Sequence, residues 1–315
     1  MSALHDSLSE YLAMRRALGT QLKWPESSLR RFVDFVEAEG REFLTTELAM
    51  RWALQPVGIQ AATYARRLSI VRSLAAWLQA TDSRTQVPPS GLLPAKHRRP
   101  APHIYSDGEI ADLMNAASQL RSASSGLRGI TFKTLIGLLV TTGLRPGEAL
   151  KLDLGDVDLL GGLLHIRESK FGKSRFVPLE KTVCAALLEY AKFRDGVSPC
   201  RHTPAFLVTT SGVRLKGGAV RRTFVKLCQT VGLRPRRKRR HGRGPRLQDM
   251  RHTFATRRLV GWYRAGFDVN RLMPRLATYL GHTSMAETYW YIQAVPELLG
   301  LATERLESTA KGAIR

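Results

Sequence analysis

Four stretches between residues 141 and 292 bring together side chains that could bind and act on a phosphate group. They are Thr141–Leu150, Glu168–Leu179, Leu247–Thr256 and Tyr279–Ile292. The first three carry arginine or lysine, whose charged N–H groups bind phosphate oxygens, and the fourth carries a histidine and several tyrosines. Each stretch alone has a structural explanation, because Arg145 could pair with Glu148 at the surface and the tyrosines could pack beside Trp290. The order and spacing of all four stretches are much more specific to one kind of site than any single stretch is.

The charge of the chain points to a polyanionic partner. The 315 residues include 49 Lys+Arg and 26 Asp+Glu, so the formal net charge is +23. Between Asp195 and Asp249 there are 14 basic residues and no acid, with the densest run from Arg234 to Arg246. Such a run cannot neutralise itself, and nucleic acid is its usual partner because each neutralised phosphate releases counterions. A solvated basic loop is the alternative, and no aromatic amphipathic anchor favours a membrane.

The composition argues against several other classes of protein. Apolar residues make up 43% and aromatic residues 8% of the chain, which suffices for a packed core and argues against wholesale disorder. No apolar run approaches the ~20 residues that span a bilayer, and the first residues show no secretory signal. Cys184, Cys200 and Cys228 are too far apart for a disulfide framework or a CxxC metal site. We therefore expect a reducing cytoplasm and no metal.

The elements that must position the four stretches fall into two domains. Residues 1–80 hold four segments with apolar residues at three- and four-residue steps, which predicts a small helical domain. Residues 81–105 contain five prolines and several basic residues, which predicts an extended linker. Residues 106–315 form the second domain, which opens at a capping-box pattern from Ser106 to Glu109. We expect a mainly α fold with a small β-sheet (α+β).

The second domain mixes helical periodicity with short alternating segments. We expect helices over 106–118, 127–142, 179–193, 218–231, 247–263, 269–280 and 284–308. We expect strands over 150–154, 163–167 and 176–179, and Gly161-Gly162 provides a turn between two of them.

Together the four stretches resemble the motifs of the tyrosine recombinases, or phage integrase family. That family joins an N-terminal helical core-binding domain, which binds DNA, to a C-terminal catalytic domain, and the resemblance covers the second domain here. Residue by residue, it implies a set of catalytic residues. They are Arg145, Lys170, Gln248, Arg251, His282 and Tyr291. Glu148 matches an acidic residue that would orient Arg145 or serve as its structural partner.

The resemblance also implies a role for each catalytic residue. The two arginines would hold the non-bridging phosphate oxygens, and Lys170 would protonate the departing 5′ oxygen. Tyr291 would attack the phosphate and form a 3′-phosphotyrosyl bond, while His282 would donate to the phosphate and pack against the nucleophile. Lys173 takes the role of Lys170 if the segment aligns with the family's lysine three residues later. Tyr289 is the alternative nucleophile. The reaction would need neither metal nor ATP, so no cofactor is expected.

One position departs from the family pattern. Gln248 stands where the family usually has histidine, and glutamine cannot take up a proton at neutral pH although it can donate and accept hydrogen bonds. His252, one helical turn later, matches a separate family histidine with a structural role. A catalytically weakened, site-specific DNA-binding protein is therefore the alternative to an active recombinase. A relaxing enzyme of the type IB topoisomerase kind is a third reading.

The resemblance further implies partners and a location. The working assembly would be a homo-tetramer on double-stranded DNA. It would act in the bacterial cytoplasm, associated with the nucleoid and not with a membrane. Accessory recombination proteins are possible further partners. The segment from Pro296 to Leu306 is most like the tails of integrases of mobile elements, and it would pack either on a neighbouring protomer or on its own domain. The residues expected to bind DNA are Arg236, Arg237, Lys238, Arg239, Arg240, Arg243, Lys173 and Arg175.

Overall fold

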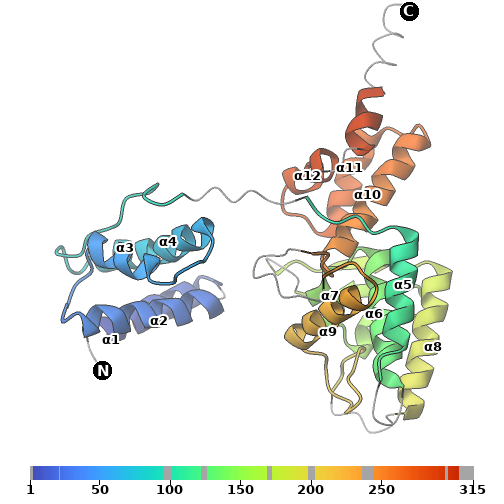
Figure 1. Ribbon diagram of the computed structural model, residues 1–315, viewed down its shortest axis with the longest axis horizontal. Helices are drawn as coiled ribbons and strands as arrows, with labels where there is room; N and C mark the ends of the chain where they lie inside the picture. The colour runs from blue at the N-terminus through green and yellow to red at the C-terminus, as the bar shows by residue number, and fades with distance from the viewer. Residues whose placement is uncertain are drawn as a thin grey trace, which may run out of the picture. The chain divides into compact units, whose positions relative to one another are not determined.

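The computed structural model (Figure 1) divides the chain into two compact units, Met1–Pro100 and Ala101–Arg315. It describes residues 3–20, 22–94, 101–121, 126–168, 172–197, 203–235, 244–294 and 297–304. No helix within these ranges is long and apolar enough to cross a membrane.

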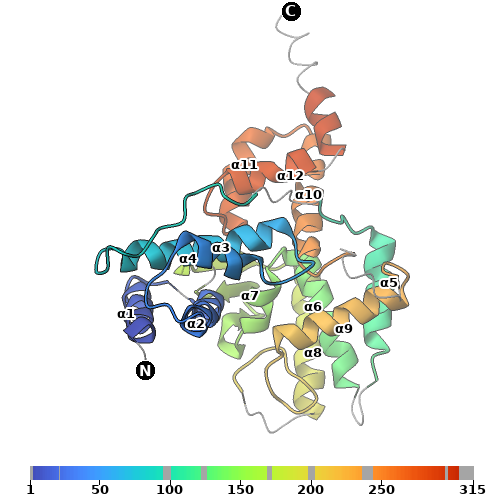
Figure 2. The same cartoon turned by 60° about the vertical axis from the view of Figure 1, so that its left-hand side comes forward.

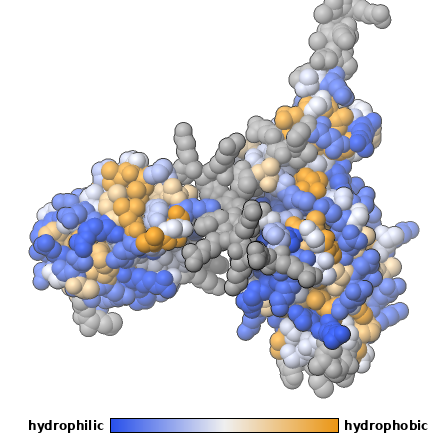
Figure 3. Space-filling view, viewed as in Figure 1, coloured by the Kyte–Doolittle hydropathy of each residue, from blue (hydrophilic) through white to orange (hydrophobic). Residues whose placement is uncertain are grey.

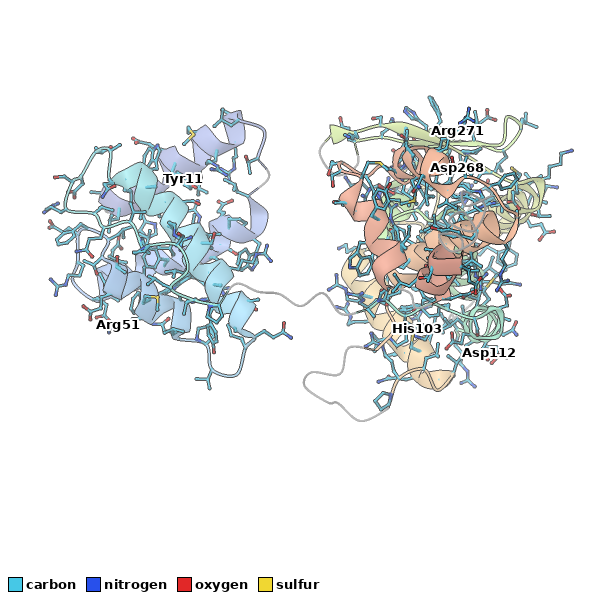
Figure 4. All side chains as sticks on the ribbon, turned by 90° about the horizontal axis from the view of Figure 1, so that it is seen from above. Tyr11, Arg51, His103, Asp112, Asp268 and Arg271 are labelled. Carbon is cyan, nitrogen blue, oxygen red and sulfur yellow. The ribbon has the colours of Figure 1, made fainter. Side chains whose placement is uncertain are left out.

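The first unit is a cluster of four helices, as the apolar periodicity predicts. They are α1 (Ala3–Ala17), α2 (Lys23–Ala38), α3 (Thr46–Leu54) and α4 (Ala61–Leu78). Thr45 caps α3 by accepting a hydrogen bond of 3.2 Å from the Leu48 amide. The ring of Tyr11 is buried and lies 5.8 Å from that of Trp77, whereas Arg51 is exposed and pairs with a glutamate (Figure 4). Apolar side chains also reach the surface over α3 and α4 (Figure 3).

Both described ends of the expected linker pack on the unit next to them. Residues 81–94 form no helix or strand, but Arg72 of α4 donates to the carbonyls of Pro88 and Pro89 at 2.7 and 2.8 Å. At the other end Tyr105 is buried in the second unit, where its hydroxyl donates to the Arg246 carbonyl at 3.0 Å. The prolines therefore remove regular structure without removing packing.

The second unit is built around α6. Its main helices are α5 (Asp107–Ser118), α6 (Leu127–Thr142), α7 (Pro146–Lys151), α8 (Lys181–Val197), α9 (Gly217–Thr230), α10 (Asp249–Arg264), α11 (Val269–Leu280) and α12 (Ala286–Ala294). Helices α5, α8 and α10 contact α6 (Figures 1 and 2), whose Leu135 and Leu139 are fully buried. The capping box is confirmed, because Ser106 and Glu109 each accept a hydrogen bond from the other's amide.

A small antiparallel sheet lies against this helical core. Its strands β1 (Val157–Asp158), β2 (Leu163–Ile166) and β3 (Arg175–Pro178) are ordered β1-β2-β3. Leu164 pairs with Val177 and both are buried, so one face of the sheet covers the core. The fold is thus mainly α with a small β-sheet, as expected. The predicted strand over 150–154 is wrong: Pro146 and Glu148 favour a helix start, and α7 continues to Lys151.

Helices α10, α11 and α12 form a separate apolar cluster at one end of the second unit (Figure 2). Asp268 begins α11 by accepting a hydrogen bond of 3.2 Å from the Arg271 amide (Figure 4). A further helical stretch over 297–304 follows α12, and its Leu298 is fully buried in the same cluster. Glu297 also pairs with Arg264 at 2.9 Å. The described part of the tail therefore packs on its own unit.

Candidate active site

Three arginines from three elements converge on the C-terminal end of α11. The last carbonyls of a helix have no partner within it and carry the negative end of the helix dipole. Here each of three successive carbonyls accepts from a guanidinium. The bonds are Arg175 Nε to Tyr279 O at 2.8 Å, Arg251 Nη2 to Leu280 O at 2.6 Å and Arg145 Nη2 to Gly281 O at 3.1 Å. This helix end therefore gathers the positive charge of the site.

Glu148 links two of these arginines. Arg145 stands at the N-cap of α7 and donates to Glu148 through its amide and its Nη1, both at 2.9 Å. Arg175, on β3, donates to both carboxylate oxygens at 3.1 and 2.9 Å. Burial alone would raise the pKa of Glu148, but the hydrogen bonds and charges of the two arginines outweigh burial and lower it. The ionised carboxylate thus orients both guanidiniums.

Arg175 makes contacts within the protein that the sequence did not indicate. Its guanidinium was predicted to bind DNA, and in the structure it is almost buried and is held by Glu148 and the Tyr279 carbonyl. It connects the start of β3 to the site as a positioning group. Lys173, two residues earlier, is exposed.

Arg251 lies deepest in the cluster. It is buried on the first turn of α10, and its Nη1 donates to the Gly143 carbonyl at 3.0 Å. Burial lowers its pKa to about 10, while a hydrogen bond with Tyr291 and the attraction of that residue act in the opposite direction. Arg251 therefore stays cationic at neutral pH. Gly143 has φ of +63°, and a Cβ there would lie 2.5 Å from the Phe254 ring, so only glycine fits.

The two candidate nucleophiles lie in different surroundings. Tyr291 on α12 is only 2% exposed, and its ring stacks with that of His282 at 5.9 Å between centroids and 23° between planes. Tyr289 is 40% exposed, since two positions along a helix turn a side chain about 200° away. The His252 ring lies 5.3 Å from those of both Trp290 and Tyr291. The structure therefore brings Tyr291, and not Tyr289, to the arginine cluster.

His282 follows Gly281, the left-handed C-cap of α11. Its Nδ1 lies 2.7 Å from the hydroxyl oxygen of Thr288 on α12. Burial, followed by the charges of Arg251 and Arg145, lowers the pKa of His282 to about 3. The imidazole is therefore neutral at physiological pH, with one nitrogen that donates and one that accepts.

Gln248 stands at the N-cap of α10, three residues before Arg251. Its side chain is half-buried and makes no hydrogen bond with any residue that the structure describes. The amide is thus available to a ligand beside Arg251, although it cannot take up a proton there.

Several expected site residues lie outside the described ranges. They are Lys170, Arg236, Arg237, Lys238, Arg239, Arg240 and Arg243. Sequence reasoning also missed residues that the structure adds, namely Thr288 and the exposed basic side chains Arg221, Arg222 and Lys226 of α9. Within the described ranges these three form no ion pair, and their i, i+1, i+5 spacing on an amphipathic helix was the available signal. In the same ranges, no group of three His, Cys, Asp or Glu could hold a metal ion.

The arrangement of arginines, histidine and tyrosine around one helix end defines a class of protein. Residues 106–297 match the phage integrase family, and this match covers more than half of the chain. The chain belongs to the phage integrase family and is a tyrosine site-specific recombinase.

Known proteins resemble the chain over nearly its whole length. A relative described as an integrase/recombinase (y4rB) of Sinorhizobium fredii (strain NBRC 101917 / NGR234) is 44% identical over 310 residues, which cover 98% of each chain. The fold is similar to the Tn1549 transposon integrase in complex with circular intermediate DNA, with TM-score 0.64, 18% identity, and 95% of this chain and 99% of that chain covered. It is also similar to a lambda integrase tetramer bound to a Holliday junction, with TM-score 0.61, 19% identity, and coverages of 91% and 76%.

Proposed function

We propose that this recombinase cleaves and rejoins double-stranded DNA through a 3′-phosphotyrosyl intermediate on Tyr291. The observation that carries the proposal is the placement of Tyr291 against both Arg251 and His282. Arg251 and Arg145 each use only part of their five N–H groups on protein carbonyls and on Glu148. Their remaining donors can hold the non-bridging oxygens of a phosphate and stabilise the charge that develops on them.

The proposed cleavage step is an in-line displacement. The hydroxyl oxygen of Tyr291 forms a bond to phosphorus, its proton leaves to solvent, and the bond from phosphorus to the 5′ oxygen breaks. The departing 5′ oxygen takes its electron pair and accepts a proton from Lys170, or from Lys173 if that residue fills the role. The energy of the phosphodiester is kept in the new bond, so a 5′ hydroxyl from a second duplex can reverse the step without ATP.

The proposed assembly is a homo-tetramer that holds two DNA sites. The lambda integrase neighbour is a tetramer bound to a four-way junction, which supports this assembly for a chain of the same fold. The basic run from 236 to 243 and the exposed basic face of α9 would bind the DNA backbone. Accessory recombination proteins and a place beside the bacterial nucleoid belong to the same proposal.

One observation favours a second candidate function. Gln248 cannot act as a base, and general acid–base assistance is worth roughly 10²–10⁴-fold in rate. A protein that occupies its DNA sites and cuts them slowly would have glutamine at this position beside otherwise complete catalytic residues. His282 and Tyr291 favour the active enzyme, because neither is needed merely to occupy a site.

A covalent-trapping assay tests the proposal. The protein is incubated without metal with nicked duplexes that span the DNA flanking its own gene, then denatured, and protein–DNA adducts are separated. We expect an adduct that Tyr291→Phe abolishes and Tyr289→Phe retains. Tight binding without an adduct, in both the wild type and Gln248→His, would support the DNA-binding alternative. An adduct that forms only in Gln248→His would show a weakened enzyme.

A further inference from the structure

Thr288 occupies a distinctive place in the site. It lies on α12 three positions before Tyr291, so the two side chains share one face of the helix. Thr288 is fully buried, and its hydroxyl oxygen lies 2.7 Å from His282 Nδ1. One short helix therefore carries both the proposed nucleophile and the group that holds the histidine.

The direction of this hydrogen bond follows from the burial of the hydroxyl. Among the described residues, the His282 ring is the hydrogen-bond partner of the Thr288 side chain, and no hydrogen bond joins the hydroxyl to a second acceptor. If Nδ1 carried the proton and donated it, the hydroxyl proton would be buried without an acceptor, which costs about 1–3 kcal/mol. The hydroxyl therefore donates, and Nδ1 accepts.

The consequence appears on the other side of the ring. Because the ring is neutral and its Nδ1 accepts, the proton must sit on Nε2. His282 Nε2 makes no hydrogen bond with any described residue, and the charges of Arg145 and Arg251 act on the same ring. The opposite tautomer would turn a lone pair toward the phosphate oxygens and repel them.

We propose that Thr288 is a positioning residue that fixes His282 in the tautomer with Nε2 protonated, so that His282 presents an N–H donor to a non-bridging oxygen of the bound phosphate. The second half of this statement rests on the proposed function. Since Thr288 and Tyr291 belong to one helix, the placement of α12 positions both the nucleophile and the histidine.

The tautomer is measured directly in the DNA-free protein. The protein is labelled with ¹⁵N at histidine, and long-range ¹H–¹⁵N spectra distinguish a protonated from an unprotonated ring nitrogen; His282→Gln identifies the signals. We expect Nε2 to be protonated in the wild type and in Thr288→Ser, and a mixture of tautomers in Thr288→Val. Protonation of Nδ1 in the wild type, or an unchanged tautomer in Thr288→Val, would overturn the proposal.

Trapping kinetics test whether Thr288 acts through His282. Loss of one preorganised donor costs roughly 10²–10³-fold, so we expect Thr288→Val to slow adduct formation by about 10–100-fold at unchanged DNA affinity, and Thr288→Ser to restore it. In a His282→Ala background, Thr288→Val should add almost nothing, whereas a merely structural threonine would give independent effects. If the tautomer is as proposed but wild-type protein forms no adduct, the proposed function fails and the positioning of His282 stands.

Discussion

Arg251 donates to the carbonyl of Leu280 at 2.6 Å, although the two residues lie on different helices and 29 positions apart. The same guanidinium holds the carbonyl of Gly143 at the end of α6. One side chain of the site thus joins the ends of α6 and α11 to the start of α10. Its structural and chemical roles are inseparable, because the donors that organise the site belong to the group that would bind phosphate.

Replacement of Arg251 by lysine should impair both stability and cleavage. The compact ammonium of lysine cannot bind the carbonyls of Gly143 and Leu280 at the same time, as the planar guanidinium does. We expect the free energy of unfolding of Arg251→Lys to fall by about 1–3 kcal/mol, and adduct formation to slow at least ~100-fold. Urea unfolding and trapping kinetics measure the two effects.

Arg258→Lys is the matched control, since Arg258 lies on the same helix but is exposed and pairs with Glu180. It should change neither quantity appreciably. Equal losses in the two variants would contradict the role assigned to Arg251.

Glu148→Gln should flatten the acid limb of the stability curve. The pKa of Glu148 is lowered in the folded protein, so the stability it contributes is present above its unfolded value of about 4.5 and is lost as pH falls further. The wild type should therefore be more stable than Glu148→Gln at pH 7, and this difference should shrink below pH 4.5. Urea unfolding at pH 7, 4.5 and 3 measures it. A constant difference, or the same trend in the exposed control Glu180→Gln, would contradict the expectation.

Gly143→Ala should reveal the close packing beside the site. Its φ of +63° disfavours a side chain, and the new Cβ would collide with Phe254. We expect a loss of about 1–3 kcal/mol in the free energy of unfolding, because both strain and overpacking contribute. Gly147→Ala, where nothing lies within 4 Å, is the control and should be neutral or slightly stabilising. Similar melting temperatures for the two variants would count against this account.

DNA binding should depend steeply on salt. Each phosphate contact contributes about 0.9 to the slope of log K against log salt, so the double variant Arg236→Gln and Lys238→Gln should reduce the slope by about 2 if both contact phosphate. Fluorescence anisotropy at several salt concentrations provides the slopes. The pair Arg221→Gln and Arg222→Gln tests the α9 face in the same way. A flat plot for the wild type would argue against backbone binding.

Local interactions explain what could be predicted from the sequence. The capping box from Ser106 to Glu109 and the cap at Thr45 each join residues three positions apart, so both can be predicted from the sequence. Apolar periodicity likewise located the helices. The resemblance to the tyrosine recombinases implied that His282 packs against Tyr291, and the structure stacks the two rings. The strand expected over 150–154 failed because alternation in so short a segment does not distinguish a strand from the end of a helix.

The helical character, the excess of positive charge and the types of side chain available for phosphate chemistry follow from the amino-acid sequence alone. Which of these side chains meet depends on how the helices and strands pack in space. Arg175 finds its partners 27 and 104 positions away, so nothing near it in the chain indicated that it would bind Glu148 and the Tyr279 carbonyl. Thr288 is buried against the ring of His282, which follows the left-handed Gly281 at the end of α11. Such contacts arise from packing between elements that are far apart in the chain, so local sequence patterns do not predict them.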